Sequence, residues 1–387
     1  MKLEINISSL KWAVLFFFLM TPGIITHIKV VSWMFDGIVV IIGILLLLIM
    51  AKSGFKFDKY VISMFLLQMW ILLSTMFNRA SITSGGKIFV RTLVVCFILY
   101  VIVKIDRNST YEALISLFHI YITINTITLF LFPNAMYLNT RGQAVCWFLG
   151  EDNYAFSYYL LANILALIYL VENNTILLAV YSFVNSYLFA WKNDIATGKI
   201  TIIVLSVLVL LGIIDKVRRT LNMFIITIVN IVVFYFLVIN RFYERISAII
   251  GLLGRNMTLS GRTIIWERVI DYITKKPVVG HGVYSAAMFD GTLNMNGLAS
   301  AHNYYLMLAF DGGIIAIILF LYVLWILYMV SVDNPNDKIS YFFMIGIFTF
   351  MFREQVENGG YEYMYILMTL FYYRNVENSQ SLSFFGI

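Results

Sequence analysis

Charged residues are scarce in this sequence. Asp, Glu, Lys and Arg make up 12% of its 387 residues, whereas they make up about a quarter of a typical soluble domain. Only four residues are proline, and 61% are hydrophobic. Runs such as 38–50 and 200–214 are apolar on every face, which does not fit the strict alternation of membrane β-strands. We therefore predict an all-α integral membrane protein.

Residues that commonly carry metal or hydrolytic chemistry are also few. The two cysteines lie in different settings, Cys96 in an apolar span and Cys146 in a loop, so we expect structural roles for both. The sequence contains no His-Glu-x-x-His, Gly-x-Ser-x-Gly, P-loop or dinucleotide-binding motif. We predict that no metal, no cofactor and no nucleic acid takes part in the function.

Apolar segments of about 20 residues, the length that crosses a bilayer, recur along the chain. The first has no small-residue cleavage site after it, so we expect it to remain as the first helix. The predicted organisation is helices 1–9 over 1–239, a large loop over 240–301, and helices 10–12 with a cytoplasmic tail over 302–387. We predict twelve spans, at 12–32, 34–51, 60–77, 89–104, 113–132, 154–171, 175–191, 200–214, 222–239, 303–331, 339–352 and 361–373.

Short basic loops follow the second, fourth and eighth predicted spans, and basic residues in short loops mark the cytoplasmic side of a membrane protein. This parity places both termini inside the cytoplasm. It places the segments 133–153, 192–199, 240–301 and 353–360 outside. The basic residues that define it are Lys52, Lys56, Lys59, Lys104, Arg107, Lys216, Arg218 and Arg219.

The large loop over 240–301 is rich in cationic side chains. Cations that face a bilayer from outside indicate an anionic ligand, and contact with anionic lipid head groups is the alternative. A stripe of apolar residues at helical spacing follows Arg262 in this loop and predicts an amphipathic helix at the membrane interface, stopped by Pro277. Its members are Ile264, Ile265, Val269, Ile270 and Ile273.

The loop and the tenth predicted span carry a series of short motifs. They are, in order, Arg262 with Trp266, Pro277-x-x-Gly280-x-Gly282, Ala301-His302-Asn303-x-x-Leu306 and Asp311-Gly312-Gly313-Ile314. In this order, over about residues 255–330, they resemble the O-antigen ligase and polysaccharide polymerase superfamily.

Two upstream features are similar to the same superfamily. Arg141 followed by Gly150-Glu151-Asp152-Asn153 lies before the sixth predicted span, where family members carry an arginine and a related segment. Members also commonly show Ser-Arg at the outer end of a following span, where this chain reads Thr197-Gly198-Lys199. Lysine keeps the charge but lacks the planar fork that grips two phosphate oxygens.

The resemblance implies a metal-independent glycosyltransferase of the bacterial cytoplasmic membrane, with its site on the extracytoplasmic face. In the polymerase branch, an undecaprenyl-pyrophosphate-linked glycan is transferred onto the non-reducing end of a second lipid-linked repeat unit of an O-antigen, capsule or exopolysaccharide. The implied partners are that lipid-linked oligosaccharide, membrane lipid, a flippase and a chain-length regulator. A ligase that delivers polysaccharide to a lipid core or protein is the first alternative. A flippase of lipid-linked sugars is the second.

The chemistry of that transfer suggests roles for individual residues. A diphosphate leaving group needs cations, and the acceptor hydroxyl needs a base. Histidine titrates near neutrality, and of the four histidines the candidate base is His302, with His281 weaker and Glu357 or Glu362 as acidic alternatives. The predicted catalytic residues are His302 and Arg262. The predicted ligands of pyrophosphate and glycan are Arg141, Lys199, Arg262, Asn303 and Arg353.

Overall fold

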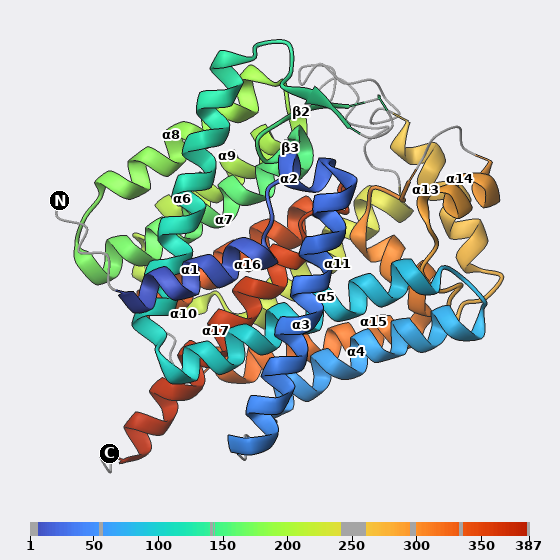
Figure 1. Ribbon diagram of the computed structural model, residues 1–387. Helices are drawn as coiled ribbons and strands as arrows, with labels where there is room; N and C mark the ends of the chain where they lie inside the picture. The colour runs from blue at the N-terminus through green and yellow to red at the C-terminus, as the bar shows by residue number, and fades with distance from the viewer. Residues whose placement is uncertain are drawn as a thin grey trace.

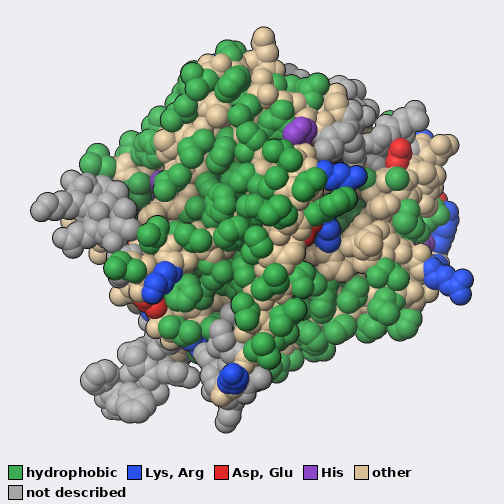
Figure 2. All heavy atoms as spheres, viewed as in Figure 1, with side chains coloured by type: hydrophobic (Ala, Val, Ile, Leu, Met, Phe, Trp, Pro, Cys, Tyr) green, Lys and Arg blue, Asp and Glu red, His purple; other side chains and the backbone are tan. Residues whose placement is uncertain are grey.

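The computed structural model describes residues 7–53, 57–139, 142, 144–240, 261–294, 299–332 and 336–384. Within these ranges the chain is a bundle of helices with one small antiparallel sheet at its edge (Figure 1). Hydrophobic side chains cover most of the face over α1, α3 and α6 (Figure 2). This outward apolar surface is what a helical membrane protein presents to lipid.

The helices before the sheet are α1 (Ile7–Leu19), α2 (Gly23–His27), α3 (Lys29–Ser53), α4 (Lys59–Phe77), α5 (Ile82–Ile105) and α6 (Arg107–Leu131). The sheet consists of β1 (Tyr137–Leu138), β2 (Val145–Trp147) and β3 (Gly150–Glu151), in the order β1-β2-β3. After it come α7 (Asp152–Asn173), α8 (Leu177–Lys192), α9 (Ala196–Leu211), α10 (Asp215–Thr220), α11 (Met223–Phe234) and the π-helical turn η1 (Tyr235–Ile239). The last helices are α13 (Arg262–Ile273), α14 (Ala286–Leu293), α15 (Tyr304–Val332), α16 (Lys338–Arg353) and α17 (Tyr361–Phe384).

Several helices begin at a side chain that satisfies the first free backbone N–H groups. Asp58 caps α4 through Val61 N, Asp106 caps α6 through Ser109 N, and Asn222 caps α11 through Ile225 N. Asp337 caps α16 in the same way. These caps place polar residues at the starts of apolar helices, where they satisfy backbone N–H groups that have no partner within the helix.

The core of the bundle lies around α7, whose residues from Ala155 to Ile168 are all buried. Helix α7 packs against α6, α8 and α16, while α15 lies along α4 and α16 along α17. Five described helices, α4, α5, α6, α7 and α15, are long and apolar enough to cross a membrane, and α1, α9 and α11 with η1 are shorter apolar helices. The helical membrane class is therefore confirmed, and twelve spans stay a prediction.

The structure differs from the predicted pattern in three places. The predicted first span 12–32 is not one helix, because α1 ends at Leu19 and Pro22 precedes the short α2. Hydrophobicity predicts the apolar run but does not detect this break. The segment 133–153 forms the β1-β2-β3 sheet, and α14 follows α13; neither was predicted. The two cysteines are buried and unpaired.

Candidate functional site

Helix α13 places Arg262 at the edge of the bundle. The helix begins after Gly261, whose φ of 85° is in the left-handed region, so the chain turns sharply into the helix there. Trp266 Nε1 donates to Ala301 O at 3.0 Å, and Ile265, Trp266 and Val269 are buried in a second apolar cluster. A helix does form over the predicted amphipathic stretch, and its place at the membrane interface stays a prediction. Its buried face includes Trp266, whereas Ile264 is exposed.

The start of α15 is tied to the loop between α16 and α17. Asn303 is fully buried: its Nδ2 donates to Gln355 O at 2.6 Å and its Oδ1 caps Leu306 N at 3.0 Å. The backbone adds a bond from Tyr304 N to Glu354 O at 2.9 Å. Asn303 therefore acts as a helix cap and clamp in this structure, with both ends of its amide occupied.

His302 lies between Ala301 and Asn303, which are both buried. The side chain of His302, in contrast, reaches solvent. Its backbone φ is 46°, in the left-handed region that non-glycine residues rarely adopt, and its side chain is 39% exposed. Strained backbone of this kind persists where neighbouring contacts hold it, and it is common at functional sites. The ring Nδ1 lies 3.7 Å from Glu357 Oε2, an ion-pair distance rather than a hydrogen bond.

Glu357 joins the two predicted catalytic residues. Its Oε1 accepts a hydrogen bond from Arg262 Nη2 at 2.5 Å, and its other oxygen faces His302. The carboxylate side chain is only 6% exposed, whereas those of Arg262 and His302 are 18% and 39% exposed. A buried carboxylate thus holds a guanidinium and an imidazole that both reach solvent. We call Arg262, His302 and Glu357 the central cluster.

The segment at the start of α9 contacts this cluster through Thr197, not Lys199. Thr197 Oγ1 donates to Asn153 Oδ1 at 3.0 Å and lies 3.4 Å from Glu357 Oε1. Lys199 instead pairs with Asp194, with its Nζ 5.8 Å from the centre of the Trp191 ring. Its charge is thereby partly neutralised by a neighbour outside the central cluster.

Arg353 is buried behind the central cluster. It is 1% exposed, its Nη1 pairs with Glu354 Oε1 at 2.5 Å, and its Nη2 donates to Asn153 O. Glu354 Oε1 also accepts from Gly360 N at 3.1 Å. A buried arginine with these partners fixes the loop that carries Glu357. Its burial leaves little surface for a ligand.

The two carboxylates of this loop have opposite shifts in pKa. Burial raises the pKa of Glu357, but His302 and the charges of Arg262 and Arg353 outweigh burial and hold its pKa at about 2. Burial raises the pKa of Glu354 to about 7, against the lowering effect of Arg353. Glu357 is therefore ionised at neutral pH, whereas Glu354 titrates close to neutral pH.

The glycine motifs bring the large loop onto α15. Gly280 has φ 75°, and a Cβ there would lie 2.6 Å from Gly313 N; Gly313 has φ 62° and lies against the backbone of Val278. His281 is in the same contact, buried with its Nε2 2.8 Å from Tyr272 O, and burial lowers its pKa. The Pro277-to-Gly282 and Asp311-to-Gly313 motifs thus pack together as scaffold.

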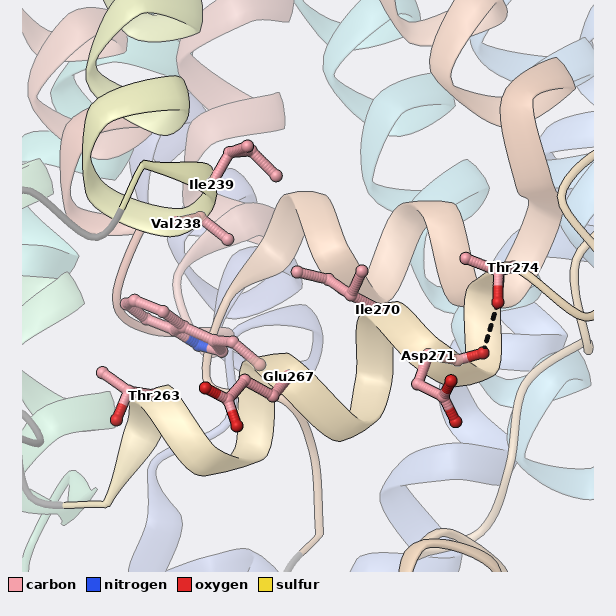
Figure 3. A pocket seen from close by; sticks show the side chains of 8 residues that line it. Val238, Ile239, Thr263, Glu267, Ile270, Asp271 and Thr274 are labelled. Atoms are coloured by element: carbon pink, nitrogen blue, oxygen red, sulfur yellow. Dashed lines mark hydrogen bonds between the residues drawn. The ribbon is translucent and has the colours of Figure 1, made fainter.

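A groove of about 480 Å³ runs beside Arg262, between η1 and α13 (Figure 3). Val238 and Ile239 form its apolar side, and Thr263 and Glu267 lie along α13 on the side that begins next to Arg262. Asp271 and Thr274 continue this polar row toward the end of the helix. Hydroxyl and carboxylate groups beside an apolar wall suit hydrogen bonding to sugars.

The structure brings together some of the predicted site residues. Arg262 and His302 share one carboxylate, and Asn303 and Arg353 lie directly behind them as buried supports. Lys199 lies next to the segment but pairs elsewhere, and Arg141 lies outside the described residues. The central position of Glu357 was missed, although it was an alternative base. The polar run over 353–357, directly after an apolar span, was the available signal.

These features define a polytopic helical membrane protein with a charged site at one end of the bundle. A family model described as O-antigen ligase matches residues 195–321, a range that includes Thr197, Arg262 and His302 and stops before Glu357. The match supports the resemblance to the O-antigen ligase and polysaccharide polymerase superfamily over this part of the chain. Comparisons with curated proteins and with solved structures gave no match.

Proposed function

We propose that this protein is a repeat-unit polymerase of the bacterial cytoplasmic membrane. It transfers a glycan from an undecaprenyl-pyrophosphate carrier onto the non-reducing sugar of a second lipid-linked repeat unit, on the extracytoplasmic face and without a metal. The observation that carries the proposal is the central cluster, in which one buried carboxylate holds both an arginine and a histidine within the matched family region.

In the proposed reaction, the acceptor hydroxyl oxygen attacks the anomeric carbon of the donor glycan. The bond from that carbon to the diphosphate oxygen breaks, and the diphosphate leaves with the bonding electrons. The hydroxyl proton passes to the exposed ring of His302. Glu357 faces Nδ1 of that ring, so it stabilises the imidazolium that forms, as a carboxylate does for a catalytic histidine in other enzymes.

Arg262 stabilises the negative charge that develops on the leaving diphosphate. Its guanidinium is fixed from one side by Glu357 and lies on the first turn of α13, at the helix end that favours anions. A guanidinium held in place before the reaction stabilises developing charge without reorganising. The groove lined by Thr263 and Glu267 begins beside it and supplies hydrogen-bonding groups for sugars of the glycan.

A ligase is the second candidate, because the matching family model carries the description O-antigen ligase. The central cluster serves both reactions equally, since each transfers a glycan from a diphosphate to a hydroxyl. The two differ in the acceptor, which is another lipid-linked repeat unit for a polymerase and a finished lipid core or protein for a ligase.

The proposal is tested with purified protein and a lipid-linked repeat unit. We expect wild type to form a ladder of lipid-linked polymer without added metal and in the presence of a chelator. His302→Ala should still bind the donor but form polymer about 10²- to 10⁴-fold more slowly, the usual cost of losing a general base. Asp215→Asn, which removes an exposed ion pair to Arg218, is the matched control.

Normal turnover by His302→Ala would refute the role of the histidine. Transfer to a lipid core with no ladder from repeat units alone would assign the ligase function instead.

The proposed face is tested by cysteines at Asn139 and Asn256 in a cysteine-free variant. Both should react with a membrane-impermeant thiol reagent in spheroplasts, and labelling of only one would overturn the predicted topology.

A further inference from the structure

A second cavity, of about 620 Å³, lies between α1, α3 and α5. Tyr154 of α7 and Glu362 of α17 line it together with these helices. Its apolar lining includes Phe18, Phe35 and Val40. Figure 2 shows basic and acidic side chains close together on an otherwise apolar face of the bundle. We call this cavity the lateral groove.

The lateral groove is bordered by an exposed apolar surface of α3. Helix α3 exposes Trp33, Met34, Ile41 and Ile44 along its length, and Val40 of the groove wall is 45% exposed. Apolar side chains exposed in this way on a membrane helix contact hydrocarbon. A ligand that enters the groove from this side therefore comes from the bilayer.

Two acid-base pairs lie in this apolar setting. Lys87 Nζ lies 2.6 Å from Asp36 Oδ2, and Arg91 Nε lies 3.3 Å from Glu362 Oε2. Their side chains remain 23% to 62% exposed, so both pairs can be approached by a ligand. Ionisable residues within membrane helices are costly and are generally functional.

The charges of the groove sum to zero, because two cations face two carboxylates. A pyrophosphate carries only negative charge, so the two carboxylates would repel it. The groove has no excess of positive charge to offset that repulsion. A zwitterionic head group matches both signs at once. Its phosphate fits beside the basic residues and its ammonium beside the carboxylates.

We propose that the lateral groove binds a bilayer phospholipid with a phosphoethanolamine head group. The primary ammonium donates hydrogen bonds to Asp36 and Glu362, the phosphate accepts from Lys87 and Arg91, and the acyl chains lie along the apolar wall. A choline head group carries the same charges but no N–H donor. A glycerol head group lacks the cation.

The bound lipid would also support the central cluster from behind. Glu362 is in the first turn of α17, and Tyr361 stacks on Tyr304 with ring centres 5.3 Å apart. Gly360, just before the helix, binds Glu354 in the loop that carries Glu357. This binding proposal does not depend on glycosyl transfer, because the lipid is measured directly.

The experiment is native mass spectrometry of the full chain with phosphatidylethanolamine, phosphatidylglycerol, phosphatidylcholine and undecaprenyl pyrophosphate. We expect wild type to bind phosphatidylethanolamine most tightly of the three phospholipids. Asp36→Asn should weaken that binding about fivefold and shift the preference toward phosphatidylglycerol, since one charge near a lipid surface changes affinity by about that factor. Asp215→Asn should change neither value.

A second variant fills the groove without replacing a residue of either ion pair. Gly86 lines the groove, and a Cβ there meets nothing within 4 Å. Gly86→Leu should abolish phosphatidylethanolamine binding, while Gly291→Leu in α14, where a Cβ also has open space, should leave it unchanged. Equal binding of the three phospholipids by wild type, or full binding by Gly86→Leu, would overturn the proposal. Binding of undecaprenyl pyrophosphate that Gly86→Leu abolishes would assign the groove to substrate and overturn it as well.

Discussion

Replacing Glu357 by glutamine tests the central cluster most directly. Glutamine keeps the size of the side chain and removes its charge, so Arg262 loses its ion pair and His302 loses the facing carboxylate. In the proposed mechanism the imidazolium is then no longer stabilised. We expect turnover to fall about 10²-fold or more, with little change in KM for the donor, because Arg262 keeps its own charge.

The cost in stability follows from the titration of the same carboxyl group. Its pKa is lowered from 4.5 to about 2 in the folded protein, which corresponds to about 3 kcal/mol. This contribution is fully present above pH 4.5 and is lost as the pH falls toward 2, because the unfolded chain takes up the proton first. Glu357→Gln lacks the contribution at every pH, yet about 3 kcal/mol is less than the stability of most domains.

The assays are polymer formation under saturating donor and thermal unfolding in detergent. A double variant with His302→Ala separates a shared role from two independent ones, since residues that act together give non-additive losses. We expect the double variant to be about as slow as His302→Ala alone. Full turnover by folded Glu357→Gln, or multiplied losses in the double variant, would refute the reasoning.

Three further predictions follow from the contacts around the site. Arg262→Lys keeps the charge but loses the fork, so we expect kcat/KM to fall about 10- to 100-fold; unchanged polymer formation at normal protein abundance would contradict this. Glu354, with its pKa raised from 4.5 to about 7, stabilises the fold below pH 4.5 and loses this contribution as the pH rises through 7. Wild type should therefore lose about 3 kcal/mol relative to Glu354→Gln between pH 4.5 and 8, and parallel unfolding curves would count against it. Gly280→Ala places a Cβ 2.6 Å from Gly313 N at φ 75°, so we expect about 1–3 kcal/mol of destabilisation, measured by thermal unfolding against Gly291→Ala.

In the proposed mechanism the donor diphosphate binds Arg262 while Arg262 is paired with Glu357. A diphosphate bound at Arg262 would place negative charge near Glu357, which the basic side chains of the site must offset. In the proposed mechanism the guanidinium stays paired with Glu357 before and after the diphosphate departs. The same carboxylate can thus hold Arg262 in place between reaction cycles.

The class of this protein could be predicted from sequence because hydrophobicity is a property of each residue. Apolar runs such as 200–214 predict membrane helices whatever they pack against, and the apolar spacing after Arg262 predicted α13. The order of motifs around Pro277 and His302 indicated a resemblance to the superfamily, which the match over residues 195–321 supports.

The tertiary structure decided which polar residues meet. Glu357 contacts Arg262, which lies 95 positions away in the chain. No local sequence pattern encodes such a contact. The sequence placed Asn303, Arg353 and Lys199 among the ligands because each is polar near the predicted outer face. In the structure, Asn303 and Arg353 are enclosed and hydrogen-bonded as supports, and Lys199 is paired with Asp194. Burial and pairing depend on how α13, α15 and α16 pack, so only the folded chain separates the residues that hold the site from those that reach solvent.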